Sequence, residues 1–473
     1  MGIMSNIKSR LIDWFLGDIS SDYQEQIRFI TKRRDYRNGL QKRNLKVRPQ
    51  QADDNLTLNF TSLVSERDVS MLLGKGVKFD YGKNQQALDC VEDVYKYNHS
   101  NILFHRAALM ATESGMVFIK TIPQDGSRTT RLIALDPILV TVETDQHDWE
   151  RVTGYIIRYK IVDKDMRDVA IKEETLQNDR GAWEIVTSES RGGRWQETSR
   201  VTWEYDFPPI LHWQNKPSVD GVWGQPDITD DVIALQDRIN FVASNISKII
   251  RMYAHPPRWG RGLGDPKRIS LGPDDIIDMG LDANSGIWQL DPVNDTPGAS
   301  GFLLTLRQAL MDITRTVDVT SLADKLGALT NFGLHVLYQD ALQKLETKRQ
   351  LWEEGFNELN RRILQIEGLA PDDCEVIWPE PLPENATEET QALEADLRMQ
   401  IVSKETVSEK RGYVWEDEKE RMDEERAMGE SLGAQLLRAF DSTGGNSNLP
   451  GSNQNEMSGT RSNIRRAGTK EPV

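Results

Sequence analysis

Little in the sequence marks a secreted, membrane-spanning or disulfide-stapled protein. Its 473 residues include only two cysteines, Cys90 and Cys374. Two cysteines so far apart cannot form a disulfide framework, and they suit a reducing compartment as plain core residues. No apolar run approaches the roughly 18 residues that a membrane span needs, and the mean hydropathy is -0.56. We therefore expect no membrane segment and no disulfide scaffold.

An excess of positive charge is also missing. The 74 acidic residues outnumber the 58 lysines and arginines, which gives a formal net charge of -16. Neutralising DNA phosphates needs clustered bases, so this composition excludes a protein that coats DNA through a broad basic surface. An acidic protein can still let DNA slide past. We interpret the basic stretch at residues 22–49 as a solvated helix face. Its bases are Lys32, Arg33, Arg34, Arg37, Lys42, Arg43, Lys46 and Arg48.

Catalytic motifs are missing as well. The segments nearest to a phosphate-binding loop are residues 76–83, with one residue too many between the glycines, and residues 115–121, without a second glycine. The six histidines show no paired metal-ligand spacing, and no nucleophile elbow is present. Asp274, Asp275 and Asp278 could hold magnesium, but acids in such a loop are usually solvated. We expect no enzyme, no cofactor and no bound metal.

The middle of the chain has the alternating pattern of β-strands. Residues 116–122 and 131–135 flank a turn and predict a hairpin, and further strands are expected through residue 205. Aromatic residues in strands more often fill a sheet core than stack on nucleic-acid bases, so we favour a core and leave stacking as the alternative. The tryptophans concerned are Trp183, Trp195, Trp203, Trp213 and Trp223.

A helical period follows Pro226. Apolar residues recur every three or four positions up to residue 254, with Asp227 as the expected N-cap. A metal site built from Asp227, Asp230 and Asp231 is the weaker alternative, because carboxylates in a first turn oppose the helix dipole. Residues 255–300, rich in glycine, proline and aspartate, predict a small compact lobe between two helices.

Three further helical regions are expected. Residues 301–319 have a narrow apolar stripe, as in helices that pack side by side in a bundle or ring. The helix predicted at residues 333–366 is much longer than average. Short charged helices follow at residues 387–440, one of them capped by Ser403. From residue 441 the chain has too few apolar residues to offset chain entropy, which predicts a disordered tail. The fold class is therefore α+β and predominantly helical.

Several segments resemble those of one family, in the same order. Phe207-Pro208-Pro209-Ile210-Leu211 with Asn215 resembles the family's strand and asparagine before its first stem helix. Asp324-Lys325-Leu326-Gly327, followed by Gly333 and the long helix, resembles its tunnel loop, and Ile401-Val402-Ser403-Lys404-Glu405-Thr406 its helical C-terminal region. This order resembles the portal proteins of tailed bacteriophages, of the type found in long non-contractile-tailed phages of Gram-positive hosts.

The resemblance implies a portal fold. The implied parts are a wing with N-terminal helices and a β-rich part at 1–225, a stem helix at 226–254, a small clip at 255–300, a second stem helix at 301–319, a tunnel loop at 320–332, a long wing helix at 333–372, a helical crown at 373–441 and a disordered tail at 442–473.

The resemblance also implies a function. Portal proteins form a homo-oligomeric ring, commonly of twelve subunits, at one capsid vertex. Double-stranded DNA enters the capsid through this channel during packaging and leaves through it during ejection. The ATPase is a separate terminase, in agreement with the missing phosphate loop. The other implied partners are major capsid, scaffolding and head-completion or tail connector proteins. The implied location is the virion, after assembly in the host bacterial cytoplasm.

The site implied in this way is the tunnel loop, with residues Thr320, Ser321, Asp324, Lys325, Leu326, Gly327 and Asn331. A channel should hold DNA weakly, because strong phosphate contacts would slow sliding. Lys325 is therefore expected to make a passing phosphate contact. Arg307, Asp312 and Arg315 are channel-facing or inter-subunit candidates, or plain surface ion pairs. The alternatives are a cytoplasmic helical scaffold without a channel, and a metal-dependent nuclease that uses Asp274, Asp275 and Asp278.

Overall fold

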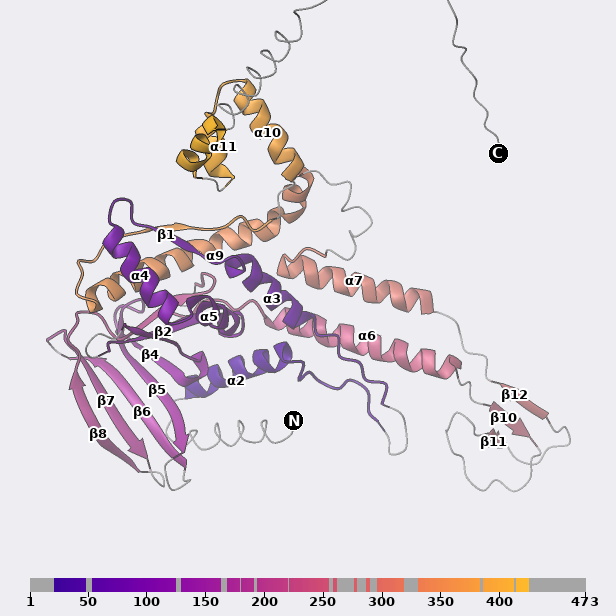
Figure 1. Cartoon of the computed structure of the whole chain (residues 1–473). Coiled ribbons are helices and arrows are strands. Elements are labelled where there is room, and N and C mark those ends of the chain that lie inside the picture. Colours follow the sequence, from indigo (N-terminus) through magenta and orange to yellow (C-terminus); the bar gives the residue numbers. More distant parts are fainter. Residues whose placement is uncertain are drawn as a thin grey trace, which may run out of the picture. The chain divides into compact units, whose positions relative to one another are not determined.

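Figure 1 shows the computed structural model of the chain, which forms two compact units, Met1–Pro383 and Glu384–Val473. The structure describes residues 21–47, 53–124, 129–162, 168–178, 180–190, 194–219, 221–254, 258–261, 276–278, 286–289, 296–318, 331–382, 386–411 and 414–424. Residues 320–330 of the expected tunnel loop, the whole expected tail at 442–473 and the first 20 residues lie outside these ranges. Among the described residues, no helix is both long and apolar enough to cross a bilayer.

Among the residues that the structure describes, four helices precede the main strands. They are α2 (Ser21–Arg37), α3 (Phe60–Leu73), α4 (Gln85–Tyr97) and α5 (Ser100–Ser114). Asn59 caps α3 and Asn84 caps α4, each by accepting a hydrogen bond from a backbone N–H of the first turn. Helix α5 ends at Gly115, whose φ of 82° lies in the left-handed region. A Cβ atom there would also collide with the carbonyl of Gly224, so only glycine fits this position.

Two antiparallel sheets follow. The three-stranded sheet has the order β3-β2-β9, and its β2–β3 pair is the predicted hairpin. The five-stranded sheet runs β4-β5-β6-β7-β8 in chain order, so each strand pairs with the next. The strands are β2 (Met116–Ile122), β3 (Arg131–Ala134), β4 (Val140–Thr144), β5 (Val152–Val162), β6 (Asp168–Gln177), β7 (Trp183–Ser190), β8 (Trp195–Thr202) and β9 (Ile210–Gln214). The β-rich middle of the chain is confirmed.

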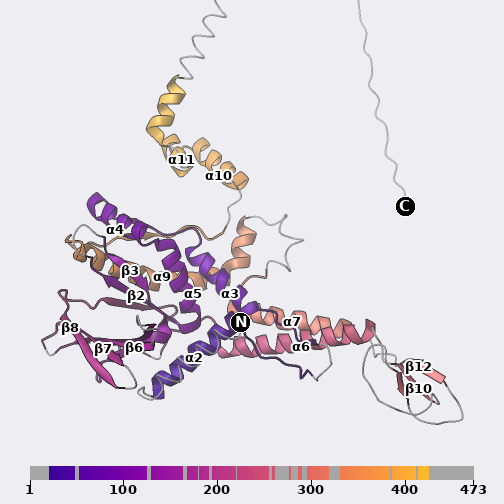
Figure 2. The ribbon, with the colours of Figure 1, turned by 60° about the horizontal axis from the view of Figure 1, so that its bottom comes forward.

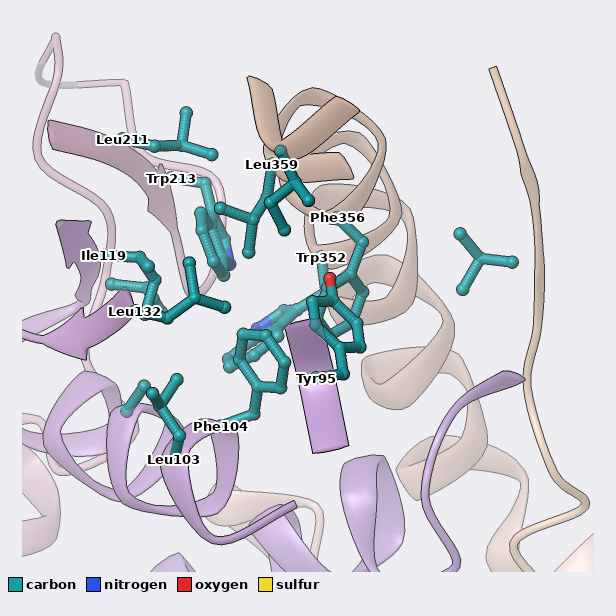
Figure 3. Close-up of a cluster of buried hydrophobic side chains, with 14 of the residues drawn as sticks. Tyr95, Leu103, Phe104, Ile119, Leu132, Leu211, Trp213, Trp352, Phe356 and Leu359 are labelled. Atoms are coloured by element: carbon teal, nitrogen blue, oxygen red, sulfur yellow. The ribbon is translucent and has the colours of Figure 1, made fainter. Parts of the chain in front are cut away.

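The largest core lies where helix α9 (Asn331–Ile366) crosses the N-terminal helices and the small sheet (Figure 3). The rings of Trp352 and Trp213 meet edge to face with centroids 5.3 Å apart, and Phe356 meets Phe104 in the same way at 4.9 Å. Gly355 of α9 leaves the space that the Trp213 ring fills. The long predicted helix, α9, is therefore the central element of this core. Strand β13 (Glu375–Ile377) follows α9 in the chain and pairs with β1 (Lys78–Asp80).

The predicted core role holds for three of the five tryptophans, since Trp223, although partly exposed, packs against the buried cluster around Phe118. Trp183 and Trp213 are 5% and 7% exposed. The other two, Trp195 and Trp203, are only partly buried.

After β9 the chain runs out along α6 (Asp230–Ala254) and returns along α7 (Thr296–Thr314), and Figures 1 and 2 show the two helices side by side. Between them, strands β10 (Arg258–Arg261), β11 (Ile276–Asp278) and β12 (Gly286–Gln289) form a small sheet in the order β11-β10-β12. Helix α7 begins earlier than predicted because Pro297 suits a first helical turn. It ends earlier because Arg315 has a φ of 53°.

The second unit contains α10 (Ala386–Arg398), α11 (Lys404–Lys410) and a further helix at residues 415–424. The hydroxyl of Ser403 accepts a hydrogen bond from the N–H of Thr406 at 3.1 Å, which confirms the predicted cap. Residues 375–377 belong to the first unit, although they follow the predicted start of the C-terminal helical region.

Candidate functional site at the base of the paired helices

The apolar stripes of α6 and α7 explain why these helices pair. Ile239 of α6 and Leu310 and Met311 of α7 are buried together with Val64 of α3. Leu235, Leu303 and Leu306 pack around them. The stripe that the sequence predicts is therefore used within the chain, between α6, α7 and α3. It does not need a second subunit.

Other apolar side chains of the pair have no cover in the single chain. Leu304 of α7 is 62% exposed and Ile250 of α6 is 55% exposed. The other large apolar side chains exposed on the pair are Ile249, Phe302 and Ile313. We interpret these exposed positions as surface that a partner covers.

A group of buried charges lies at the base of the paired helices. Asp227, expected to cap α6, instead lies three residues before the helix, and its side chain is fully buried. Lys348 of α9 contacts its Oδ2 atom at 2.6 Å, and Lys216 and Lys344 approach Oδ1 at 3.3 and 3.5 Å. Three cations therefore surround one carboxylate. The N-cap prediction was wrong. An aspartate just before a helix gives the same sequence pattern whether its side chain caps the helix or pairs with a lysine from a distant segment.

A second acid completes this cluster. Asp68 of α3 contacts Lys344 and lies 3.5 Å from Lys348. Lys344 also donates a hydrogen bond to the carbonyl of Thr314, at the end of α7, at 3.0 Å. We call Asp68, Lys216, Asp227, Lys344 and Lys348 the charge hub. It joins α3, the start of α6, the end of α7 and the middle of α9 at one point.

The pKa values in the charge hub follow from its geometry. Burial alone would raise the pKa of Asp227, but Lys348, Lys344 and Lys216 hold that pKa well below 3.8. Burial would lower the pKa of Lys344, yet Asp227 and Asp68 together raise it. For Lys216 burial dominates and the pKa is lowered. The hub is therefore an ionised cluster whose carboxylate is the common partner of all three lysines.

The basic helix α2 is also anchored by charge. Glu113 of α5 has a fully buried side chain and accepts from both Arg34, at 2.7 Å, and Arg37. Arg33 is 3% exposed and donates to the carbonyl of Ile228 at 2.7 Å. The interpretation of residues 22–49 as a solvated helix face was therefore wrong for these three arginines. Their charge is used to hold α2 against α5 and the start of α6.

The predicted stem positions Arg307, Asp312 and Arg315 lie in α7 or directly after it. Arg307 of α7 is tied within the chain to Asp318 at 2.6 Å, and its guanidinium lies over the Phe60 ring. Asp312 and Arg315 are exposed. The predicted tunnel-loop residues Thr320, Ser321, Asp324, Lys325, Leu326 and Gly327 lie outside the described residues. Asn331 is the first residue of α9.

No metal-binding group of His, Cys, Asp or Glu side chains is present among the described residues. Asp230 is paired with Lys32 and Arg33, and Asp227 with lysines, so neither fits the metal site weighed from sequence. Asp274 and Asp275 lie outside the described residues, and only the backbone of Asp278 is described, as the last residue of β11.

Sequence reasoning missed the charge hub, although one signal was present. Lys348 shares the helical spacing of one face of α9 with Ala341, Leu345 and Trp352, and these three apolar side chains are buried. A lysine at such a position must meet a buried acid, because an unpaired charge there would be too costly. The partner itself could not be identified, since Asp68 and Asp227 lie far away in the sequence.

The chain has an α+β body, and buried charges hold this body to two long paired helices. Large apolar side chains are exposed along the pair. Together these features define a structural subunit of an assembly. The sequence matches the family of phage portal proteins, SPP1 Gp6-like, over residues 16–431, and the chain belongs to this family. It is a portal protein. No curated protein matches the sequence significantly.

Two solved structures with weak similarity to this chain come from gene transfer agent particles. A chain from the virion of a native gene transfer agent particle has a TM-score of 0.40 and 14% identity, and the match covers 74% of this chain and 88% of that chain. A chain from the neck of an empty particle has a TM-score of 0.40 and 13% identity, with the same coverage.

Proposed function

We propose that copies of this portal protein form a ring of twelve subunits at one capsid vertex, with α6 and α7 around a channel for double-stranded DNA. The observation that carries the ring is the set of exposed large apolar side chains on the paired helices, among them Ile250 and Leu304. In a ring, each pair of helices lies beside the next, so these side chains leave the water. DNA would enter through the channel during packaging and leave through it during ejection.

The parts of the chain take the following proposed roles. Residues 1–225 form the wing, 226–254 and 301–319 the stem, 255–300 the clip, 320–332 the tunnel loop and 333–372 the long wing helix. The helical crown is proposed from residue 384, because residues 375–377 pair with β1 in the first unit. It extends to residue 441, and residues 442–473 form the tail. The clip is the proposed docking platform for terminase and later for head-completion proteins. Capsid and scaffolding proteins would surround the wing during assembly in the host cytoplasm.

The channel is proposed to hold DNA weakly. The tunnel-loop residues Thr320 to Gly327 and Asn331 would project from the stem toward the DNA, with Lys325 making a passing phosphate contact. Asp312 and Arg315 are proposed to face the channel or a neighbouring subunit, because both side chains are exposed to solvent in the single chain. Arg307 is better suited to fixing the start of the loop, because it is tied to Asp318.

The ring can be tested directly by mass photometry of the purified chain, together with negative-stain images. We expect a homo-oligomer of about twelve times the 53.9 kDa chain mass, with a central pore and no DNA required. A stable monomer in physiological salt would contradict the proposal. An oligomer without a pore would favour the scaffold alternative, and cleavage of plasmid DNA in the presence of magnesium would favour the nuclease.

The tunnel loop is tested by replacing Asp324 and Lys325 together with alanine. We expect normal rings but less packaged DNA, because the loop would contact DNA and not a neighbouring subunit. The measurement is the amount of nuclease-protected DNA per particle in a packaging assay, with ring mass measured in parallel. Loss of rings would instead assign the loop a purely structural role.

A further inference from the structure

Two described parts of the segment between α2 and α3 lie along helix α6. We call them the stem strap, with a first limb at residues 38–47 and a second limb at residues 53–59. Three polar side chains on one face of α6 hold its second limb: Ser244, Asn240 and Gln236 accept from the N–H groups of Leu56, Leu58 and Phe60 at 2.9, 2.9 and 3.2 Å. The amide of Gln236 also donates back to the carbonyl of Leu58.

The two spacings fit each other. Four residues of an α-helix rise about 6.0 Å, and two residues of an extended chain rise about 6.6 Å. Side chains at every fourth helix position can therefore reach every second residue of a strand. All three α6 side chains are at most 1% exposed, so these hydrogen bonds are protected from water. These three hydrogen bonds bind the second limb through its main chain and do not depend on the side chains of Leu56 and Leu58.

Three further contacts fix the limbs. Arg251 of α6 forms a two-point ion pair with Asp54, at 2.6 and 2.7 Å. Asn55 bonds both main-chain groups of Leu45, with Leu45 donating at 2.8 Å and accepting at 3.0 Å. Asn44 donates to the carbonyl of Asp237. The first limb is thereby held beside the second one, against α6.

The side chains of the strap have an unusual surface composition for this acidic protein. The first limb, residues 38–47, carries Lys42, Arg43 and Lys46 and no acidic residue, and all three are exposed. Large apolar side chains lie exposed among them. These are Leu40, at 59%, Val47, at 42%, and Leu56, at 43%. The acids of the second limb are already paired, Asp54 with Arg251 and Asp53 with Arg43 at 3.4 Å.

We propose that the stem strap is an inter-subunit contact, in which its cationic and apolar side chains dock on an acid-bearing surface of the neighbouring copy. This inference rests on the proposed ring. A second copy is the fitting partner because the chain carries a formal net charge of -16, so its surface outside the strap is rich in acids. Hydrogen bonds between the strap main chain and α6 hold the strap in place, and its exposed side chains contact the neighbouring copy.

The test reverses the charge of the first limb in the variant K42E/R43E/K46E. A matched control, K78E/K83E/K96E, makes the same charge change at three exposed lysines away from the strap. Ring mass is measured by mass photometry over a range of protein and salt concentrations, and folding by circular dichroism. We expect ring association about tenfold or more weaker for the strap variant, because like charges would then face each other. The control should assemble as the wild type does.

The outcomes separate the two proposals. Wild-type rings should loosen as salt rises, because partly exposed ion pairs are screened. Strap-variant rings as stable as those of the wild type would overturn the contact. Normal strap-variant rings that package less DNA would also overturn it and would assign the strap to DNA. If the wild type and the control both fail to form rings, the proposed function itself fails.

Discussion

Replacing Asp227 with alanine is expected to destabilise the first unit by about 3–5 kcal/mol, the range for removing one partner of a buried ion pair. The substitution would leave Lys216, Lys344 and Lys348 buried around a missing anion, because Asp227 is the only hub residue that contacts all three. The free energy of unfolding can be measured by urea denaturation followed by tryptophan fluorescence.

The matched control is Asp230→Ala. Asp230 is an aspartate in the first turn of α6 and is also ion-paired, but its side chain is 66% exposed. Its loss should cost no more than about 1 kcal/mol. Equal losses for the two variants would show that burial of the charge hub contributes little.

The same residue sets a pH dependence. Asp227 has a pKa held well below 3.8 in the folded chain, whereas an aspartate in an unfolded chain titrates near about 3.9. Between these values the unfolded state binds more protons, so stability rises with pH. The contribution of Asp227 is complete above about pH 4 and is lost as the pH falls through the folded pKa. The variant Asp227→Asn should therefore lose less stability than the wild type on acidification below pH 4.

Replacing Gly355 with alanine should destabilise the protein, although alanine is the better helix former. In an exposed helix the change would gain about 1 kcal/mol. At residue 355 the new Cβ atom would lie 2.5 Å from the Trp213 ring. Overpacking of this kind typically costs about 1–3 kcal/mol. We expect a net loss, because the Trp213 ring is packed between α9 and the core and cannot move away freely.

Gly301→Ala provides the control of opposite sign. Gly301 lies within α7, and nothing lies within 4 Å of the position of its Cβ atom. The variant should be more stable than the wild type by about 0.5–1 kcal/mol. Thermal unfolding of both variants in the same buffer measures the contrast. A stabilised Gly355→Ala variant would mean that the contact between Trp213 and α9 is loose.

The local pattern of the sequence predicted the elements that are periodic on their own. The hairpin of β2 and β3, the helix after Pro226 and the long helix that begins near Gly333 all repeat an apolar spacing over many residues. The end of α7 had no such signal, because an arginine rarely adopts the φ of 53° that Arg315 has.

Contacts between distant segments were beyond sequence reasoning. Arg34 and Glu113 lie on different helices, and nothing local shows that α2 and α5 meet. A basic stretch has the same sequence pattern whether its side chains face water or pair with buried carboxylates. The stem strap was missed for a related reason: nothing near Leu56 and Leu58 in the sequence shows that α6 binds their N–H groups.

Main-chain binding of the stem strap has a consequence for how this protein can change over generations. Substitutions at Thr57 or Leu56 would leave the N–H groups that α6 binds in place, as long as no proline is introduced. The outer side of the strap can therefore drift in sequence without losing its position. A lineage could adjust that surface to an altered neighbour by single mutations, while the buried glutamine, asparagine and serine of α6 stay under constraint.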